Sequence, residues 1–141
     1  MKTAIKWEGK MAFSGTTPSG HKIHMDAAAE IGGENTGARP TELLLHAVAG
    51  CTAIDIVSIL KKMRLNLTDL SIDIEGSRAE EHPKRFTGIH IHYSLEGDLP
   101  EDKVARAIKL SKETYCSVSN SLSAEIKVSY DINGIPGSPL I

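Results

Sequence analysis

The chain has 141 residues, of which 40% are hydrophobic and 24% charged, and its formal net charge is −2. This length favours one domain, residues 1–141, that is large enough to form its own hydrophobic core. The slightly acidic balance, with lysines and arginines interleaved among acids, argues against a surface for nucleic acids or anionic membranes.

The first ten residues lack the apolar segment of a signal peptide, and we identify no stretch of transmembrane length. We therefore expect a cytoplasmic protein without a membrane partner. In such a reducing compartment permanent disulfides are rare. Cys51 and Cys116, the only two cysteines, are accordingly expected to be free thiols or to react transiently.

Residues 1–36 are predicted to form short strands and a loop. The ranges 2–8 and 10–14 are expected to be two strands flanking Gly9, and residues 16–20 a turn that contains Pro and Gly. From His21, apolar and polar residues alternate as in a third strand. Residues 31–40, with three glycines, are expected to be a loop that leads to a helix.

A central helix is predicted over residues 39–64. Pro40 suits the first helical position, and Glu42 favours the positive end of the helix dipole. Between Leu43 and Met63 apolar side chains occur on every face, so we expect this helix to be buried all round or enclosed by a partner subunit. A domain of this size can hardly surround it alone, which predicts a homodimer.

Residues 67–133 are predicted to contain strands, a second helix and a last strand. Apolar residues alternate over 67–80 and 86–97, with Ile89, Ile91 and Tyr93 facing inward. Residues 100–102, Pro-Glu-Asp, begin a helical pattern, a short helix is expected near 117–123, and the last strand covers 124–132. Residues 134–141 form a tail that is loose or lies on a neighbour. This order implies an α+β fold with antiparallel sheets.

The central helix carries one polar stripe, in which Cys51, Asp55, Ser58 and Lys62 are three or four residues apart. Such a stripe can line a crevice or an interface. On residue type alone, however, Cys51 is expected to be an inert core side chain. Cys116 lies at a helix boundary, where unpaired amides can favour a thiolate.

The histidines do not point to a metal. His90 and His92 share the strand face opposite Ile89 and are expected to face solvent, while His46 interrupts the central helix and is expected to be a satisfied polar group. A zinc site would need further ligands that the spacing does not reveal. The chain also lacks phosphate-binding and dinucleotide fingerprints. We therefore expect neither a metal nor a cofactor.

The stretch PTELLLHAVAGCTAIDIVSILKKM, followed 65 residues after Cys51 by TYCSVSNSL and then by AEIKVSYDI, resembles the OsmC/Ohr family of osmotically inducible and organic hydroperoxide resistance proteins. The form LLLHAVAGCTAIDIVSILKKMR is most similar to the YhfA-like branch. The resemblance covers about Ile5 to Ile132 in the same order of elements. It implies a swapped homodimer in which two long helices are enclosed by sheets from both chains.

The resemblance also implies a thiol peroxidase that needs no metal. Cys51 would be the peroxidatic residue, oxidised by an organic hydroperoxide to a sulfenic acid, and Cys116 would resolve it as a disulfide. An external dithiol would then restore both thiols.

Two features depart from the family pattern. The family's glutamate position holds Thr41, so Glu42 is either catalytic or only a helix cap. The early strands contain no arginine, and Lys10, Arg39 or Lys62 could instead supply the cation that a buried thiolate needs. Two other functions therefore remain open: a non-catalytic dimer that binds a small apolar ligand, and a redox sensor whose cysteines react slowly.

Overall fold

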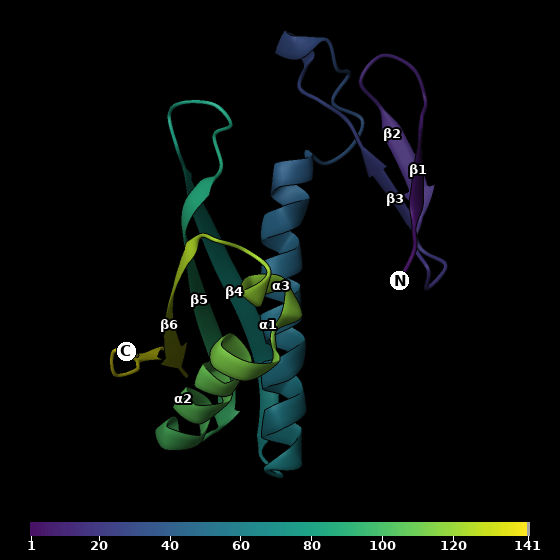
Figure 1. Ribbon diagram of the computed structural model, residues 1–141. Helices are drawn as coiled ribbons and strands as arrows, with labels where there is room; N and C mark the ends of the chain where they lie inside the picture. The colour runs from purple at the N-terminus through teal and green to yellow at the C-terminus, as the bar shows by residue number, and fades with distance from the viewer. Residues whose placement is uncertain (141) are drawn as a thin grey trace. The chain divides into compact units, whose positions relative to one another are not determined.

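The computed structural model describes residues 1–140. The chain forms two compact units, Met1–Leu44 and Leu45–Ile141, which are described separately (Figure 1). Each unit contains one β-sheet, and a long helix begins at the end of the first unit and continues in the second. The predicted α+β class with two sheets and a central helix is therefore confirmed.

The first unit contains a three-stranded antiparallel sheet of β1 (Ala4–Trp7), β2 (Phe13–Thr16) and β3 (Lys22–Met25). The predicted strand at 10–14 begins late, because residues 9–12 form a turn. Gly9 and Lys10 have positive φ angles of 100° and 48°, and the Ala12 N–H donates to the Gly9 carbonyl at 3.0 Å. A 3-10 turn, η1 (Ala29–Ile31), lies just before the predicted loop and overlaps it only at Ile31.

The pairing register gives this first sheet one apolar face. Trp7 is paired with Phe13 and Phe13 with Met25, while Ile5 and Ile23 flank Gly15 on the same side. Most of these side chains are exposed in the single chain. The sheet therefore presents an apolar surface that the single chain leaves largely in contact with solvent.

Helix α1 (Pro40–Lys62) matches the predicted central helix to within two residues at each end. It ends where Arg64 adopts a positive φ of 59° and the Leu65 N–H donates to the Leu60 carbonyl. Its fully buried residues form one stripe at a spacing of four: Val48, Thr52, Ile56 and Leu60. Ile54 is 72% exposed. The single chain therefore covers one face of the helix, and enclosure of its other faces by a partner subunit stays a prediction.

The expectation that no stretch reaches transmembrane length is wrong for helix α1. By length and apolar composition, its 23 residues would be sufficient to cross a bilayer. A core helix of a soluble protein has the same properties, however. The buried stripe of α1 packs against the sheet of the second unit, so we describe α1 as a core helix.

The second unit contains a four-stranded sheet in the order β4 (Asn66–Arg78), β5 (Phe86–Asp98), β6 (Glu125–Ile132) and β7 (Ile135–Pro136). Strands β4 and β5 are antiparallel, as expected, but β5 and β6 are parallel. The prediction of purely antiparallel sheets is therefore wrong at this pair. Three helical segments connect β5 to β6, and such a crossover is what parallel neighbours require.

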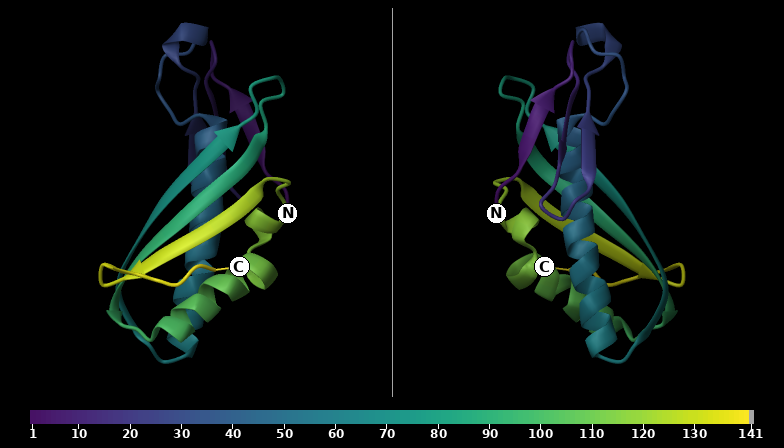
Figure 2. Two further views of the ribbon diagram at one scale, coloured as in Figure 1. Left: turned by 90° about the vertical axis from the view of Figure 1, so that its left-hand side faces the viewer. Right: turned by 90° about the vertical axis from the view of Figure 1, so that its right-hand side faces the viewer.

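These connecting segments are α2 (Glu101–Leu110), a π-helical turn η2 (Ser111–Tyr115) and α3 (Ser117–Asn120). Helices α1 and α2 lie on the same face of the sheet (Figure 2). The core between these layers contains the inward residues of β5, the buried stripe of α1 and one face of α2; its buried members include Ile89, Ile91, Tyr93, Leu95, Val104, Ala107 and Ile108. The inward orientation predicted for Ile89, Ile91 and Tyr93 is confirmed.

Residues 134–140 do not form a loose tail. Strand β7 pairs with β6, the Ser138 N–H donates to Glu101 Oε1 at 2.8 Å, and Leu140 packs against the core. The Tyr130 hydroxyl donates to the same Glu101 oxygen at 3.1 Å. These donors lower the pKa of Glu101, with the bonds from Ser138 as the largest cause. Residues 134–140 are therefore held against the second unit within the single chain, and the alternative that the tail lies on a neighbour stays a prediction.

Candidate active site

The two cysteines meet in the second unit, although 65 positions separate them in the sequence. Cys51 lies in the middle of α1, and Cys116 lies between the π-helical turn and α3. The sulfur atoms of Cys51 and Cys116 and a carboxylate oxygen of Asp55 are all within 4.8 Å of one another. Both cysteines are free thiols. The fold therefore brings together two reduced sulfurs and one carboxylate.

The backbone around Cys116 fixes the position of its sulfur. The Cys116 N–H donates to the Ser111 carbonyl at 2.8 Å, which closes the π-helical turn. The sulfur then accepts the Ser119 N–H at 3.3 Å as the N-cap of α3. π-Helical turns are rare and occur frequently at functional sites. Cys116 is fully buried, whereas Cys51 is partly exposed.

The surroundings of Cys51 disfavour its ionised form. Burial is the main reason that its pKa is raised, and the nearby Cys116 and Asp55 raise it further. A hydrogen bond from the backbone of Val118 acts in the opposite direction. Ionisation of this thiol requires a cation, a proton acceptor or a change in the site.

A buried polar cluster lies beside the sulfurs, and two of its members, Thr52 and Ser111, were not identified from the sequence. The Ser111 hydroxyl donates to Asp55 Oδ2 at 2.9 Å, and the Thr52 hydroxyl donates to the Ala49 carbonyl at 3.0 Å. Tyr93 is 1% exposed, and burial raises its pKa to about 12 despite a hydrogen bond with Thr52. The tyrosine therefore stays protonated in the same cluster as Asp55 and Cys116, whose charges raise its pKa further.

Comparisons with known proteins agree with this geometry. The sequence model of the OsmC-like protein family matches residues 33–131. The chain belongs to the OsmC-like family. It is 39% identical to the protein YhfA of Escherichia coli over 134 residues, which cover 92% of this chain and 95% of YhfA. An uncharacterized protein of Bacillus subtilis, YmaD, is 30% identical over 86% of this chain and 85% of its own length.

Solved structures of OsmC-like proteins share the fold. A hypothetical protein from Aquifex aeolicus has a TM-score of 0.83 at 33% identity, covering 94% of this chain and 95% of its own. A Legionella pneumophila protein described as an organic hydroperoxide resistance protein has a TM-score of 0.67 at 23% identity, with 94% and 96% covered. The resemblance found in the sequence, including the YhfA-like branch, is therefore confirmed.

The polar stripe predicted on the central helix of this OsmC-like chain leads into a groove. Asp55, Ser58 and Lys62 line a groove of about 440 Å³ together with Arg106 from α2. Its other lining residues include Ile59, Met63, Leu110 and Tyr115. Asp55 belongs both to this groove and to the cluster with the two sulfurs, although the groove lining within residues 1–140 includes neither cysteine. The groove is partly apolar and carries two cations, Lys62 and Arg106. Arg106 was not predicted, since its helix showed only an amphipathic pattern.

The other candidate cations belong to the first unit. Lys10 Nζ lies 3.5 Å from Glu34 Oε2, and Arg39 Nη1 donates to Asn35 Oδ1 at 2.7 Å. Glu42 Oε1 accepts the Arg39 N–H at 2.7 Å. A glutamate at the third helical position that binds back to the start of the helix is a capping interaction. Glu42 therefore serves as a cap in this chain.

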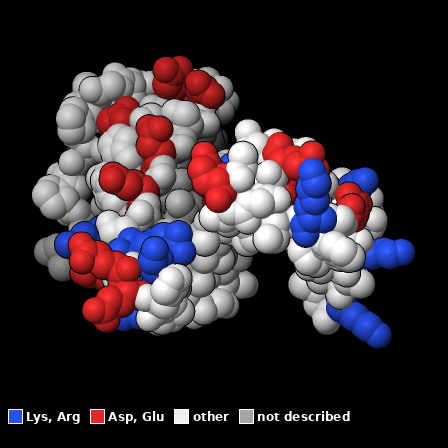
Figure 3. All heavy atoms as spheres, turned by 90° about the horizontal axis from the view of Figure 1, so that it is seen from above, with Lys and Arg blue, Asp and Glu red and all other residues white. Residues whose placement is uncertain are grey.

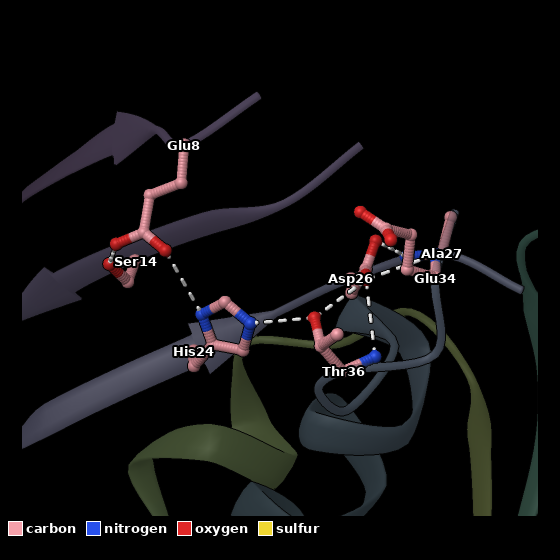
Figure 4. Close-up of polar contacts among 7 residues, drawn as sticks. All are labelled: Glu8, Ser14, His24, Asp26, Ala27, Glu34 and Thr36. Carbon is pink, nitrogen blue, oxygen red and sulfur yellow. Dashed lines mark hydrogen bonds and ion pairs between the residues drawn. The ribbon is translucent and has the colours of Figure 1, made fainter. Parts of the chain in front are cut away.

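A second polar network organises the loop between β3 and α1 in the first unit (Figure 4). Asp26 is 3% exposed and accepts four hydrogen bonds: from the N–H groups of Ala27, Glu34 and Thr36 and from the Thr36 hydroxyl. With the Thr36 hydroxyl as the largest cause, these donors lower the pKa of Asp26 to about 2. His24 connects Thr36 to Glu8, which also binds Ser14. The network fixes the backbone of residues 26–36.

The strand histidines face away from the core, as expected. His90 Nε2 and His92 Nδ1 both lie within 2.8 Å of the Ser129 hydroxyl, and His92 Nε2 lies 2.8 Å from Asp131 Oδ2. The bond to His92 is the main reason that the pKa of Asp131 is lowered. This row crosses two strands of an open sheet face, and we assign it a structural role.

Charge is mixed on the face shown in Figure 3, where lysines and arginines occur beside acidic side chains. The drawn face therefore shows no continuous basic surface of the kind that binds nucleic acids.

Proposed function

We propose that this OsmC-like protein is a thiol-dependent peroxidase that reduces organic hydroperoxides through Cys51 and Cys116. The observation that carries the proposal is the approach of two reduced sulfurs to within 4.8 Å in a largely buried site. Proteins of the same fold are described as organic hydroperoxide resistance proteins. These names support the substrate class.

The difference in exposure supports different roles for the two thiols. Cys51 is partly exposed and lies beside Asp55, which lines the groove, whereas Cys116 is fully buried. A peroxide that enters from the groove reaches Cys51 first. Cys116 is then placed to attack the oxidised Cys51 from within the protein. We therefore propose that Cys51 is peroxidatic and Cys116 resolving.

The reaction needs two proton transfers and no metal. The Cys51 thiol gives up its proton, and its sulfur attacks one peroxide oxygen. The O–O bond breaks, an alcohol leaves with one proton, and Cys51 becomes a sulfenic acid. The Cys116 sulfur then attacks Cys51, water leaves and a disulfide forms. An external dithiol reduces this disulfide by exchange and is itself oxidised to a disulfide.

Asp55 is the carboxylate positioned to accept the Cys51 proton. Its oxygen lies within 4.8 Å of the Cys51 sulfur, and the Ser111 hydroxyl fixes its orientation. Proton transfer to Asp55 removes the negative charge that opposes the thiolate. The apolar side chains of the groove, such as Ile59 and Leu110, suit an alkyl group better than they suit hydrogen peroxide.

We further propose a cytoplasmic homodimer. The single chain leaves an apolar face on the first sheet and exposes Ile54 and Val57 on α1. A second copy of the chain would cover both surfaces and remove them from water. Ile54→Asp should therefore convert the dimer to a monomer in light scattering. Ile135→Asp is the matched control, because both residues are 72% exposed and Ile135 lies on β7.

Peroxide consumption tests the enzymatic proposal. The protein is supplied with cumene hydroperoxide and a dithiol, and the loss of peroxide is followed. Cys51→Ser should abolish turnover. Cys116→Ser should accumulate a sulfenic acid at Cys51 that reacts with dimedone. A wild-type protein that forms neither sulfenate nor disulfide and turns over none of several hydroperoxides would refute the proposal.

A slow redox sensor is the second candidate function. The raised pKa of Cys51 favours it, because a thiol that stays protonated reacts slowly with peroxide. The number of turnovers separates the two functions. A sensor forms the disulfide once per oxidation event, whereas a peroxidase continues to consume peroxide while dithiol is present.

A further inference from the structure

Cys51, Cys116 and Asp55 form a set of ligands as well as a redox pair. Their two sulfurs and one carboxylate oxygen lie within 4.8 Å of one another. Thiolates and a carboxylate are ligands that zinc accepts in tetrahedral sites. We propose that the reduced protein binds one Zn²⁺ ion per chain through Cys51, Cys116 and Asp55, with water in the fourth position.

The distances fit this ion with a small adjustment. Zinc–sulfur bonds of about 2.3 Å in a tetrahedral site place two sulfurs about 3.8 Å apart. The observed upper limit of 4.8 Å therefore requires the two sulfurs to approach by about 1 Å at most, and each sulfur–oxygen pair by slightly more because zinc–oxygen bonds are shorter. The ligands come from α1 and from the turn before α3.

Groups around the ligands already hold them in place. The Ser111 hydroxyl donates to Asp55 Oδ2 at 2.9 Å and orients the carboxylate. The Ser119 N–H donates to the Cys116 sulfur at 3.3 Å. Hydrogen bonds of this kind orient metal ligands and contribute to their affinity. They also reduce the conformational freedom that metal binding would otherwise remove.

Charge favours a cation at this position. The three ionised groups would carry three negative charges in a poorly solvated space. Within residues 1–140, none of the ion pairs involves Cys51, Asp55 or Cys116. A divalent ion between them would replace mutual repulsion with three favourable contacts.

Zinc binding and disulfide formation exclude each other, and this part of the inference rests on the proposed function. The zinc-bound state holds both sulfurs as thiolates. When an organic hydroperoxide oxidises them, the S–S bond forms, the O–O bond breaks, two protons are taken up, and alcohol, water and free Zn²⁺ are released. Bound zinc should therefore slow oxidation, and the disulfide form should not bind zinc.

Competition with a chromophoric chelator measures the affinity of the site for zinc. Reduced protein is titrated with Zn²⁺ under argon, and Co²⁺ is used in parallel because thiolate ligands give it a charge-transfer band. We expect one ion per chain and a thiolate–cobalt band. Cys51→Ser, Cys116→Ser and Asp55→Asn should each weaken binding at least about 10- to 100-fold, the range found when even outer-shell partners are removed.

Two control variants separate this site from other ligands. Asp73→Asn removes an exposed carboxylate on β4, and the double variant His90→Gln/His92→Gln removes the outer-face histidines; both should bind zinc as the wild type does. Loss of binding in the histidine variant, or a cobalt spectrum without the thiolate band, would overturn the inference. Circular dichroism checks that every variant is folded.

Wild-type protein with both cysteines alkylated by iodoacetamide provides a test without mutation. It should not bind zinc, and undiminished binding would refute the site. The experiments can also refute the zinc site or the peroxidase activity without refuting the other proposal. Zinc binding without peroxide turnover supports the site and contradicts the peroxidase, whereas turnover with no zinc binding to the reduced protein supports the peroxidase and contradicts the site.

Discussion

The loop around Asp26 and the pocket around Cys51 shift the pKa of an acidic side chain in opposite directions. Asp26 in the first unit accepts four hydrogen bonds from Ala27, Glu34 and Thr36, and its pKa falls to about 2. Cys51 in the second unit receives one backbone hydrogen bond, from Val118, and lies beside a carboxylate and a second thiol. Its pKa is raised.

In Asp26 the hydrogen bonds outweigh the effect of burial on the pKa, whereas in Cys51 burial outweighs the single backbone hydrogen bond. Asp26 is surrounded by N–H and O–H groups that are in place before it ionises, so its charge stabilises the loop. Cys51 lacks comparable donors and stays protonated until a proton acceptor, a cation or a substrate changes its surroundings. The first arrangement is suited to structure and the second to a reaction that must be triggered.

The largest expected effect is on the packing beside the sulfurs. Tyr93→Ala should lower the free energy of unfolding by about 3–5 kcal/mol, because it removes a fully buried aromatic ring. Tyr93→Phe keeps the ring and loses only the hydroxyl, which should cost about 0.5–1.5 kcal/mol. Urea denaturation of both variants measures the difference. If the two variants are equally destabilised, the hydroxyl and not the ring determines the stability of this region.

A smaller effect is expected when the charge beside Cys51 is removed. Asp55→Asn keeps the shape of the side chain and its bond from Ser111 but removes a negative charge that raises the pKa of Cys51. The thiolate fraction at neutral pH should rise, and iodoacetamide should alkylate Cys51 a few times faster. The rate is followed by mass spectrometry at several pH values.

Asp73→Asn is the control for this experiment, because Asp73 is an exposed carboxylate on β4. In the Asp73→Asn variant, iodoacetamide should alkylate Cys51 at the wild-type rate. Peroxide turnover gives an independent result: Asp55→Asn should reduce turnover if Asp55 accepts the Cys51 proton, even though alkylation becomes faster. Faster alkylation together with faster turnover would exclude Asp55 as the proton acceptor.

The sequence was most informative where the alternation of apolar and polar residues determined which face of a strand is buried. The alternation over β5 placed Ile89, Ile91 and Tyr93 in the core and His90 on the other side, and the structure agrees. The cysteine pair was also identified, since its surrounding motifs matched a family. Both inferences depend on residues that are close in sequence or fixed by a shared motif.

Features that depend on distant segments could not be predicted in this way. The parallel pairing of β5 with β6 follows from the crossover of α2 and α3, which strand patterns do not encode. Ser111 resembles any serine after a helix, and its bond to Asp55 joins residues 56 positions apart. Helix α1 carries apolar side chains on several faces, but the single chain buries only the stripe of Val48, Thr52, Ile56 and Leu60, so the apolar pattern alone did not predict which face is covered.

The smallest effect at neutral pH is expected in the loop of the first unit. Asp26→Asn cannot accept charge-assisted bonds, so the amides of Glu34 and Thr36 should exchange with solvent a few times faster than in the wild type. The control is Asp69→Asn, because Asp69 is exposed and binds only the neighbouring Leu70 N–H.

Lowering the pH should remove this difference in amide exchange rate between the wild type and Asp26→Asn. The native state lowers the pKa of Asp26 from 3.8 to about 2, so the carboxylate contributes its full stabilisation above pH 3.8 and loses it as the pH falls toward 2. Wild-type protection at Glu34 and Thr36 should therefore fall to the level of Asp26→Asn across this window, while the variant changes little. Hydrogen exchange measured by NMR at a series of pH values tests this. If the wild type keeps its advantage at pH 2, donors other than those bound to Asp26 hold the loop, and the contrast with Cys51 would not arise from hydrogen bonding.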